Sequence, residues 1–219
     1  MVERPELPGY VVVEGPIGVG KTALAQRLAD RFAAARLLES DDPNPFLERF
    51  YKDRGGAALP AQLFFLFERA RQLETLRQED LFAPARVADF LIQKDRLFAE
   101  LNLTPEELSL YEQILARLSI DAPAPGLVVY LQAPVDVLKS RLRQRRGRYD
   151  SLIDDAYLER VNSAYARFFY DYDEAPLLIV NAATIDPVHN DSDFEALVRE
   201  IVRAPRGRRF FNPVAGAIA

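Results

Sequence analysis

The 219-residue sequence contains no cysteine, no tryptophan, one methionine and one histidine. Without cysteine, the chain cannot form a disulfide, a zinc–thiolate site, an iron–sulfur cluster or a thiol nucleophile. A Ser–His–Asp triad or a multi-histidine metal site could be built only around the lone His189. Chemistry is therefore left to carboxylates, lysine, arginine, hydroxyls and backbone amides.

Long apolar runs and an excess of positive charge are also missing. No stretch approaches 18 consecutive apolar residues, so the sequence predicts no membrane span. The N-terminal MVERPELPGY carries acidic residues and no apolar core, which is not typical of a signal peptide. The 28 Lys and Arg against 33 Asp and Glu give a net charge of −5, which disfavours a general nucleic-acid binder. We expect a soluble cytoplasmic protein with neither a membrane nor a nucleic acid as its partner.

Apolar runs alternate with helical patterns along the chain. Runs rich in Val, Leu and Ile predict strands at 10–14, 86–91, 126–132 and 177–181, with a weaker one at 36–39. Because these runs do not alternate with polar residues, they are typical of strands covered on both faces of a parallel sheet. Helical spacing is found at 21–35, 60–80, 104–118, 134–145, 154–172 and 192–202. The order predicts an α/β fold: a doubly wound, five-stranded parallel sheet with helices on both faces.

The length is that of one domain, and no linker or repeat divides the chain. We predict a single domain over 1–203, with an arginine-rich lid at about 143–153. Residues 204–219 form a tail that is basic and then rich in Gly, Pro and Ala. Two interpretations of the tail stay open: a loosely ordered end, or a segment that contacts phosphate or a partner subunit.

A phosphate-binding motif follows the first predicted strand and opens the first predicted helix. GPIGVGKT matches G-x-x-x-x-G-K-[ST], in the structural context that the motif requires. Glycines let successive backbone N–H groups surround a phosphate, and the helix N-terminus adds partial positive charge. Lys21 should reach the β- and γ-phosphates, and the Thr22 hydroxyl should ligate Mg²⁺. The predicted phosphate-binding residues are Gly15, Pro16, Ile17, Gly18, Val19, Gly20, Lys21 and Thr22.

This motif alone does not separate kinases from GTPases or ATPases. No N-K-x-D motif for reading guanine is present, which argues against a typical GTPase. The short chain and the charged segment at 144–150 favour a small kinase with a closing lid.

Further motifs follow in a fixed order: LLESDDPNPFLERFYKD, PAQLFFLFER, KDRLFA, and RLRQRRGRYDS before DDAYLERVN. With GPIGVGKT, they make the chain resemble the deoxynucleoside kinases, in particular the bacterial deoxyadenosine/deoxyguanosine kinase type, over roughly residues 10–190. The resemblance implies a P-loop NTPase-like fold, ATP as donor with Mg²⁺, and a homodimer. It also implies transfer of the γ-phosphoryl group to the 5′-hydroxyl of a deoxynucleoside, which gives the monophosphate for nucleotide salvage.

Glu39 follows the weaker predicted strand, five residues before Asn44-Pro45-Phe46. In the family that this sequence resembles, the glutamate at the position of Glu39 is the general base for the nucleoside 5′-hydroxyl. A sugar hydroxyl must lose its proton as it attacks a phosphoryl group, and a positioned carboxylate can accept that proton. The resemblance therefore implies that Glu39 acts with Lys21 and Arg145 in catalysis.

The same resemblance assigns the substrate contacts. Tyr51 and Asp150 match the residues that touch the sugar 3′-hydroxyl, and Gln62 and Asp95 match those that recognise the base. Arg69 matches a substrate-site arginine on the same helix as Gln62. Gln62 and Arg69 are two turns apart and so share one face of their helix. Together, Gln62 and Asp95 suit a purine edge, so deoxyadenosine or deoxyguanosine is favoured and deoxycytidine stays open.

Five arginines lie in the segment that resembles the family's lid. A planar guanidinium matches two phosphoryl oxygens at once, which is why arginine suits a lid over transferring phosphate. We expect Arg145 and Arg148 to contact ATP, with Arg141 as the next candidate. His189 lies where such kinases cover the adenine of ATP, although a surface position is the better interpretation for a lone loop histidine.

One departure from the family pattern lies at the end of the third predicted strand. Most relatives carry Glu-Arg-Ser there, whereas this chain has Asp89-Phe90-Leu91. Asp89 keeps a carboxylate where an acid would bind the metal, most simply through water. The arginine is replaced by Phe90, so the positive charge near Glu39 would have to come from Lys94 or Arg69.

Two alternatives to a deoxynucleoside kinase stay open. A nucleoside monophosphate kinase, similar to thymidylate kinase, would need an arginine where this chain has neutral and acidic sugar contacts. A non-catalytic nucleotide-binding structural subunit is disfavoured by the intact Gly-Lys-Thr and by Glu39, and favoured weakly by the missing arginine.

Overall fold

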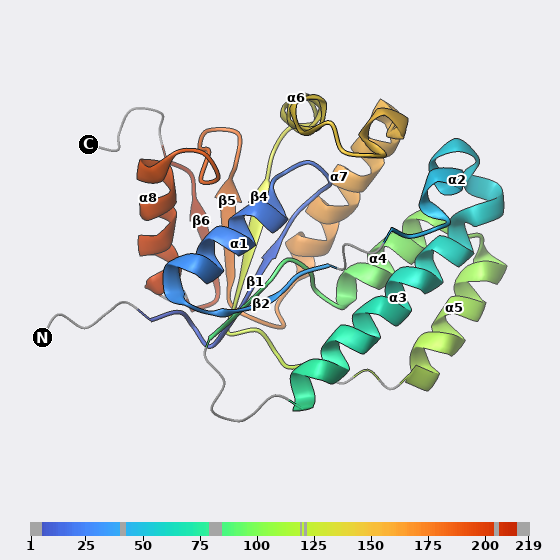
Figure 1. Ribbon diagram of the computed structural model, residues 1–219, viewed down its shortest axis with the longest axis horizontal. Coiled ribbons are helices and arrows are strands. Elements are labelled where there is room, and N and C mark those ends of the chain that lie inside the picture. The colour runs from blue at the N-terminus through green and yellow to red at the C-terminus, as the bar shows by residue number, and fades with distance from the viewer. Residues whose placement is uncertain are drawn as a thin grey trace, which may run out of the picture.

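The computed structural model describes residues 6–39, 43–78, 85–118, 120, 122–203 and 206–213. Its centre is a parallel sheet with the strand order β2-β3-β1-β4-β5-β6 (Figure 1). The strands are β1 (Tyr10–Glu14), β2 (Ala35–Leu37), β3 (Arg86–Ala88), β4 (Leu127–Gln132), β5 (Leu177–Asn181) and β6 (Arg208–Phe211). This is the α/β fold with a parallel sheet that the sequence predicts.

Helices connect the strands and cover both faces of the sheet. They are α1 (Lys21–Phe32), α2 (Leu47–Lys52), α3 (Arg54–Gln78), α4 (Gln93–Asn102), α5 (Pro105–Leu118), α6 (Val135–Arg145), α7 (Asp155–Asp171) and α8 (Asp191–Val202). A short 3-10 turn, η1 (Asp150–Leu152), precedes α7. Helices α3 and α5 lie together at the end of the molecule opposite α8 (Figure 1). None of the helices in the described ranges has the length and apolarity needed to cross a bilayer.

Successive residues of β1 face two different cores, because side chains alternate along a strand. Val11 and Val13 join the core that contains side chains of α1, α6 and α8. Val12 joins the core made by α2, α3, α4 and α7. The all-apolar run therefore reflects burial on both faces, as predicted.

The sheet has one strand more than expected, because part of the predicted tail pairs with β5. Leu177 to Val180 are in register with Arg208 to Phe211. Phe211 packs on the core while Phe210 is 71% exposed, an alternation typical of an edge strand. Four residues between Gly207 and Asn212 give too short a pattern to be assigned from the sequence.

One helix begins earlier than expected, and two helices were not predicted. Helix α3 begins at Arg54 and runs through Pro60, where the helical pattern was expected to start. Helices α2 and α4 were not predicted, since both are short and mix charged with apolar residues. The capping box before α5 is formed, with reciprocal hydrogen bonds between Thr104 and Glu107.

Candidate active site

The phosphate loop joins the carboxyl end of β1 to α1, where open α/β sheets bind ligands. Gly18 and Gly20 have φ angles of 84° and 102°, a region that disfavours side chains. A Cβ at Gly18 would also lie 2.8 Å from the side chain of Leu142. Both glycines are therefore required by the loop's backbone path and not only by its sequence motif.

Asp89, at the end of β3, joins the phosphate loop to the segment that carries Glu39. One oxygen of its fully buried carboxylate accepts a hydrogen bond from the Thr22 hydroxyl. The other accepts the Glu39 backbone N–H at 2.7 Å. The Asp89 carboxylate therefore sets the position of Glu39 relative to the loop.

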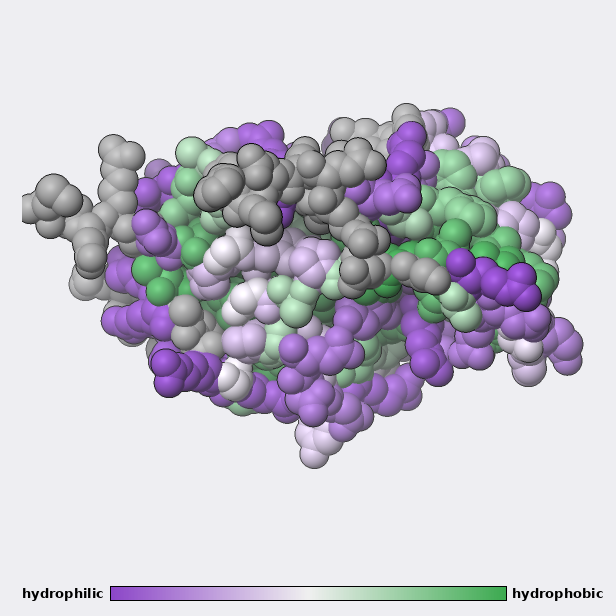
Figure 2. All heavy atoms as spheres, turned by 90° about the horizontal axis from the view of Figure 1, so that it is seen from below, coloured by the Kyte–Doolittle hydropathy of each residue, from purple (hydrophilic) through white to green (hydrophobic). Residues whose placement is uncertain are grey.

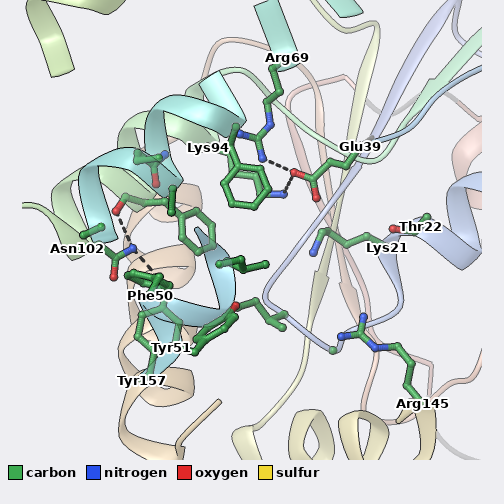
Figure 3. Close-up of a pocket in the computed structure, with 18 residues that line it drawn as sticks. Lys21, Thr22, Glu39, Phe50, Tyr51, Arg69, Lys94, Asn102, Arg145 and Tyr157 are labelled. Atoms are coloured by element: carbon green, nitrogen blue, oxygen red, sulfur yellow. Dashed lines mark hydrogen bonds and ion pairs between the residues drawn. The ribbon is translucent and has the colours of Figure 1, made fainter. Parts of the chain in front are cut away.

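Glu39 and Arg69 share one cavity of about 210 Å³ with the end of the phosphate loop (Figure 3). Gln62 lines the same cavity. Its walls come from the phosphate loop, α2, α3, α4 and α7. The lining includes Ile17, Gly18, Lys21, Thr22, Glu39, Phe50, Tyr51, Gln62, Phe65, Arg69, Lys94, Phe98, Asn102, Arg145 and Tyr157. Burial, together with the neighbouring Lys94 ammonium, lowers the pKa of Lys21 to about 8.

Two cations hold the Glu39 carboxylate through the same oxygen. Arg69 donates a hydrogen bond to Oε1 from α3, and the Lys94 ammonium lies 2.9 Å from the same atom (Figure 3). Burial by itself would raise the pKa of Glu39, but the Lys94 and Arg69 charges outweigh burial and hold that pKa well below its usual range. Glu39 is therefore an anion at neutral pH, and its Oε2 is not the atom that the two cations bind.

Beyond Glu39, a buried polar cluster closes the cavity. Arg69 is 5% exposed and bonds Asp95 with one nitrogen while it bonds Glu39 with another. The Gln62 side-chain amide donates to the Asp95 backbone carbonyl at 2.9 Å. Gln62 and Arg69 line the cavity, and Asp95 lies behind them. Burial raises the pKa of Asp95 to about 6, against the attraction of Arg69.

Aromatic rings form the wall next to α2. Tyr51 lies between Phe50, Tyr149 and Tyr157, with ring centroids 5.2, 6.4 and 6.0 Å away. Asn102 lines the same wall, and its side-chain amide donates to the Tyr157 hydroxyl at 3.3 Å. The wall offers ring faces with a few polar groups, as ligand pockets commonly do.

In the segment predicted to form a lid, Arg145 and Asp150 contact each other. The Arg145 guanidinium bonds both oxygens of Asp150, one of them at 2.9 Å, and the Gly147 N–H donates to the same carboxylate at 2.8 Å. Arg148 is exposed and lies over the ring of Tyr149. The structure thus brings Arg145 to the cavity and leaves Arg148 and Asp150 outside its lining.

A second cavity, of about 340 Å³, lies on the other side of the phosphate loop. Gly18 and Arg145 line both cavities. Arg141 donates to the Val19 carbonyl at 2.9 Å and to the Ala182 carbonyl at 2.6 Å, so it ties the loop to the chain after β5. His189 lines this second cavity and is largely exposed, with its ring 2.9 Å from Asp186.

Sequence reasoning did not single out Asn102 or Tyr157, and it offered Lys94 only as a substitute cation. Lys94, Phe98 and Asn102 are spaced by four residues along α4, so they form one stripe that faces the cavity. That spacing is visible in the sequence once α4 is recognised as a helix. Tyr157 belongs to the predicted apolar face of α7, where a tyrosine resembles an ordinary core residue.

Comparison with known proteins agrees with this geometry. Residues 11–204 match the family described as "Deoxynucleoside kinase". A deoxyguanosine kinase of Bacillus subtilis (strain 168) is 33% identical over 197 residues, which cover 88% of this chain and 95% of that protein. A deoxyadenosine kinase of Lactobacillus acidophilus is 26% identical over 205 residues, covering 87% and 94%. The fold also matches a solved deoxyadenosine kinase from M. mycoides with bound dATP, with a TM-score of 0.74, 20% identity, and coverage of 88% and 98%. The chain therefore belongs to the deoxynucleoside kinase family of ATP-dependent kinases.

Proposed function

We propose that this kinase transfers the γ-phosphoryl group of ATP to the 5′-hydroxyl of a purine deoxynucleoside, deoxyguanosine or deoxyadenosine, and so forms the monophosphate for nucleotide salvage. The observation that carries the proposal is the meeting of two cavities at the phosphate loop, with Gly18 and Arg145 lining both. An acceptor in the cavity of Glu39 and a donor in the other would meet beside Lys21. The names of the Bacillus and Lactobacillus relatives support the purine bases.

Glu39 is the proposed base. Its Oε1 is bound by Arg69 and Lys94, so Oε2 is the oxygen to accept the 5′-hydroxyl proton. As the 5′-oxygen bonds the γ-phosphorus, the bond from that phosphorus to the bridging oxygen breaks and ADP leaves. Such a transfer depends chiefly on positioning and charge neutralisation. The fixed Glu39 carboxylate would position the 5′-hydroxyl.

Cations from the loop and the lid are proposed to neutralise the phosphates. The phosphate loop, Gly15 to Thr22, would hold the β-phosphate with its N–H groups, and Lys21 would reach the β- and γ-phosphates. Arg145, and Arg148 after lid movement, would bind the transferring group. Arg145 must then exchange Asp150 for phosphate, and the Gly147 N–H still donates to the Asp150 carboxylate after the exchange.

The nucleoside is proposed to lie across the aromatic wall with its base toward α3. Gln62 and Arg69 would meet the base, with Asp95 fixing both of them. Tyr51 would meet the sugar 3′-hydroxyl. Asp150 would join Tyr51 at the 3′-hydroxyl only after Arg145 has released it. The contact of Arg145 with phosphate and the contact of Asp150 with the sugar therefore both require the Arg145–Asp150 pair to break.

Thr22 and Asp89 are proposed to hold Mg²⁺ together with the ATP phosphates. Their hydroxyl and carboxylate oxygens lie in contact at the end of the loop, and such hard oxygens are the donors that Mg²⁺ prefers. No cluster of three or more acidic, cysteine or histidine ligands exists among the described residues, which fits an ion held largely by phosphate and water. When bound, the ion would offset the charge on the β- and γ-oxygens.

A homodimer through α3 and α5 is proposed from the exposed apolar side chains of these helices. Phe67 and Leu110 are 50% and 47% exposed. Figure 2 shows hydrophobic residues gathered toward the end of the molecule where α3 and α5 lie. Apolar patches of this kind mark protein interfaces. The cytoplasmic location that the cysteine-free sequence predicts stays a prediction.

The test is incubation with Mg²⁺, ATP labelled at the γ-phosphate, and each of the four deoxynucleosides in turn, followed by chromatography. We expect label in dGMP or dAMP. Glu39→Gln should abolish most of the transfer while ATP affinity, measured by calorimetry, is unchanged. If no nucleoside is labelled although ATP binds, the proposal fails, and label in a diphosphate made from an added monophosphate would identify a monophosphate kinase instead.

A further inference from the structure

Phe90 occupies the position after Asp89 where the family pattern leads one to expect an arginine, and it is 1% exposed. The Arg69 guanidinium carbon lies 5.7 Å from the centre of the Phe90 ring and 5.4 Å from that of Phe65. Contacts of this kind attract a cation to an aromatic face. Phe90 therefore supports a cation that comes from α3 instead of supplying one itself.

Lys94 brings a second cation from α4 to the same place. It lies in the first turn, where its backbone N–H donates to the Leu91 carbonyl at 3.1 Å, and it is 7% exposed. A buried ammonium is costly unless it is paired, and its ion pair is with Glu39 at 2.9 Å. The burial of Lys94 is thus explained by the carboxylate that the reaction uses.

The hydrogen bond from Arg69 alone does not fix the orientation of the Glu39 carboxylate. Its guanidinium is divided, with one nitrogen on Asp95 and another on Glu39. A single bond to Oε1 permits rotation of the carboxylate about the bond to its Cγ atom. A second donor on Oε1, from a different helix, restricts that rotation and keeps Oε2 available.

We propose that Lys94 is the positioning residue that replaces the strand-end arginine, fixing Glu39 Oε1 so that Oε2 receives the 5′-hydroxyl proton. The proposal rests on the proposed function, because it gives Lys94 a role in the same transfer. Lys94 acts through Glu39 and is not itself required to bind ATP or the nucleoside.

The first test compares Lys94→Met, Lys94→Arg and the control Lys52→Met, which changes an exposed lysine paired with Glu48. Misplacement of a reacting group costs about a hundredfold, so we expect Lys94→Met to lower kcat by about that factor. KM for ATP and for the deoxynucleoside should change less than about threefold, and Lys94→Arg should regain at least about tenfold in kcat. Thermal unfolding confirms that each variant is folded, and Lys94→Gln replaces Lys94→Met if the latter is not.

The second test is a double-mutant cycle with Glu39→Gln. If Lys94 acts through Glu39, adding Lys94→Met to Glu39→Gln should lower the residual kcat by less than about threefold. An undiminished hundredfold loss in that background overturns the proposal, as does a Lys94→Met variant with the kcat of the parent. A parent protein that transfers no phosphoryl group overturns both this inference and the proposed function, whereas failure of the inference alone shows only in the variants.

Discussion

The Arg145 guanidinium bonds both oxygens of the Asp150 carboxylate across the turn that follows α6. Gly147 stands inside this turn, where a Cβ would lie 2.8 Å from an Asp150 oxygen. The turn thus holds the side chain of Arg145 at the boundary of the two cavities. The same arginine is then both the partner of Asp150 and a lining residue of both cavities, where it is proposed to bind phosphate.

Arg145→Ala should therefore reduce catalysis more than stability. Loss of one preorganised charge on the transferring group lowers kcat by about 100- to 1,000-fold. The Asp150 side chain is only 8% exposed and keeps the Gly147 N–H as a partner, so loss of Arg145 should lower the free energy of unfolding by about 1–3 kcal/mol. Steady-state kinetics and urea unfolding measure the two effects. The control is Arg143→Ala, an exposed arginine of the same helix that lines neither cavity. If Arg143→Ala lowers kcat as much as Arg145→Ala does, the effect comes from the total positive charge of the helix and not from the position of Arg145.

Gln62→Ala should weaken binding of the deoxynucleoside without affecting ATP. The Gln62 amide is fixed on the Asp95 carbonyl and lines the cavity, so its loss should remove the proposed base contact, worth about 1–3 kcal/mol. We expect KM for the deoxynucleoside to rise by about tenfold or more, while KM for ATP stays within about threefold. Gln113→Ala, at an exposed glutamine whose amide bonds the Ser109 carbonyl, is the control. An unchanged KM for all four deoxynucleosides would remove Gln62 from base recognition.

Local patterns in the sequence predicted β1 to β5 and the phosphate loop because each depends on a short, contiguous run. The grouping of Lys21, Glu39, Gln62 and Arg69 around one cavity came from the resemblance, and the structure brings all four side chains there. Asp95 was expected at the base, yet it meets the cavity only through Arg69 and Gln62. The position of Asp95 behind these two residues depends on tertiary packing, which the spacing of motifs in the sequence does not predict.

Helix α4 shows why other parts were not predicted. Its cavity-facing stripe begins with a lysine, which pattern rules place on the solvent side because charged residues are rarely buried. Lys94 is buried because the Glu39 carboxylate, which pairs with it, arrives from a distant segment. Strand β6 is similar, since it exists only by pairing with β5. In both cases the partner, not the segment itself, determines the structure.

The apolar face of α3 and α5 should determine the oligomeric state. We expect analytical ultracentrifugation of the parent to give a mass of about twice the 24.8 kDa of one chain. The double variant Phe67→Glu/Leu110→Glu places two carboxylates in the interface and should sediment as a single chain, since unpaired charges at an interface are strongly unfavourable.

The matched control is Phe210→Glu, which alters an exposed aromatic residue of β6. This variant should keep the mass of the parent in analytical ultracentrifugation. If Phe210→Glu dissociates the dimer and the double variant does not, the interface lies on the sheet edge instead of on α3 and α5.

Asp95 should make the folded state less stable as the pH rises from about 4 to about 6. Burial raises its pKa to about 6 in the fold, against about 3.9 in an unfolded chain. Arg69 and Lys94 oppose this shift, while burial and the Glu39 charge favour it; the nearby Tyr111 hydroxyl stays neutral because burial raises its own pKa. The folded state thus binds the proton more tightly than the unfolded state. The resulting stability is fully present below about pH 4 and is lost as the pH rises through about 6.

Asp95→Asn removes this titration while it keeps an oxygen for Arg69. Between pH 4 and pH 7, the free energy of unfolding of the parent should fall relative to that of the variant by about 2 kcal/mol. Urea unfolding at pH 4, 5, 6 and 7 measures the difference, and Asp173→Asn, at an exposed aspartate, serves as the control with no such trend. A constant gap between parent and variant over this range would place the Asp95 pKa near its ordinary value. The Arg69 charge would then fully offset the burial of Asp95, and the carboxylate would be ionised whenever the enzyme binds its nucleoside.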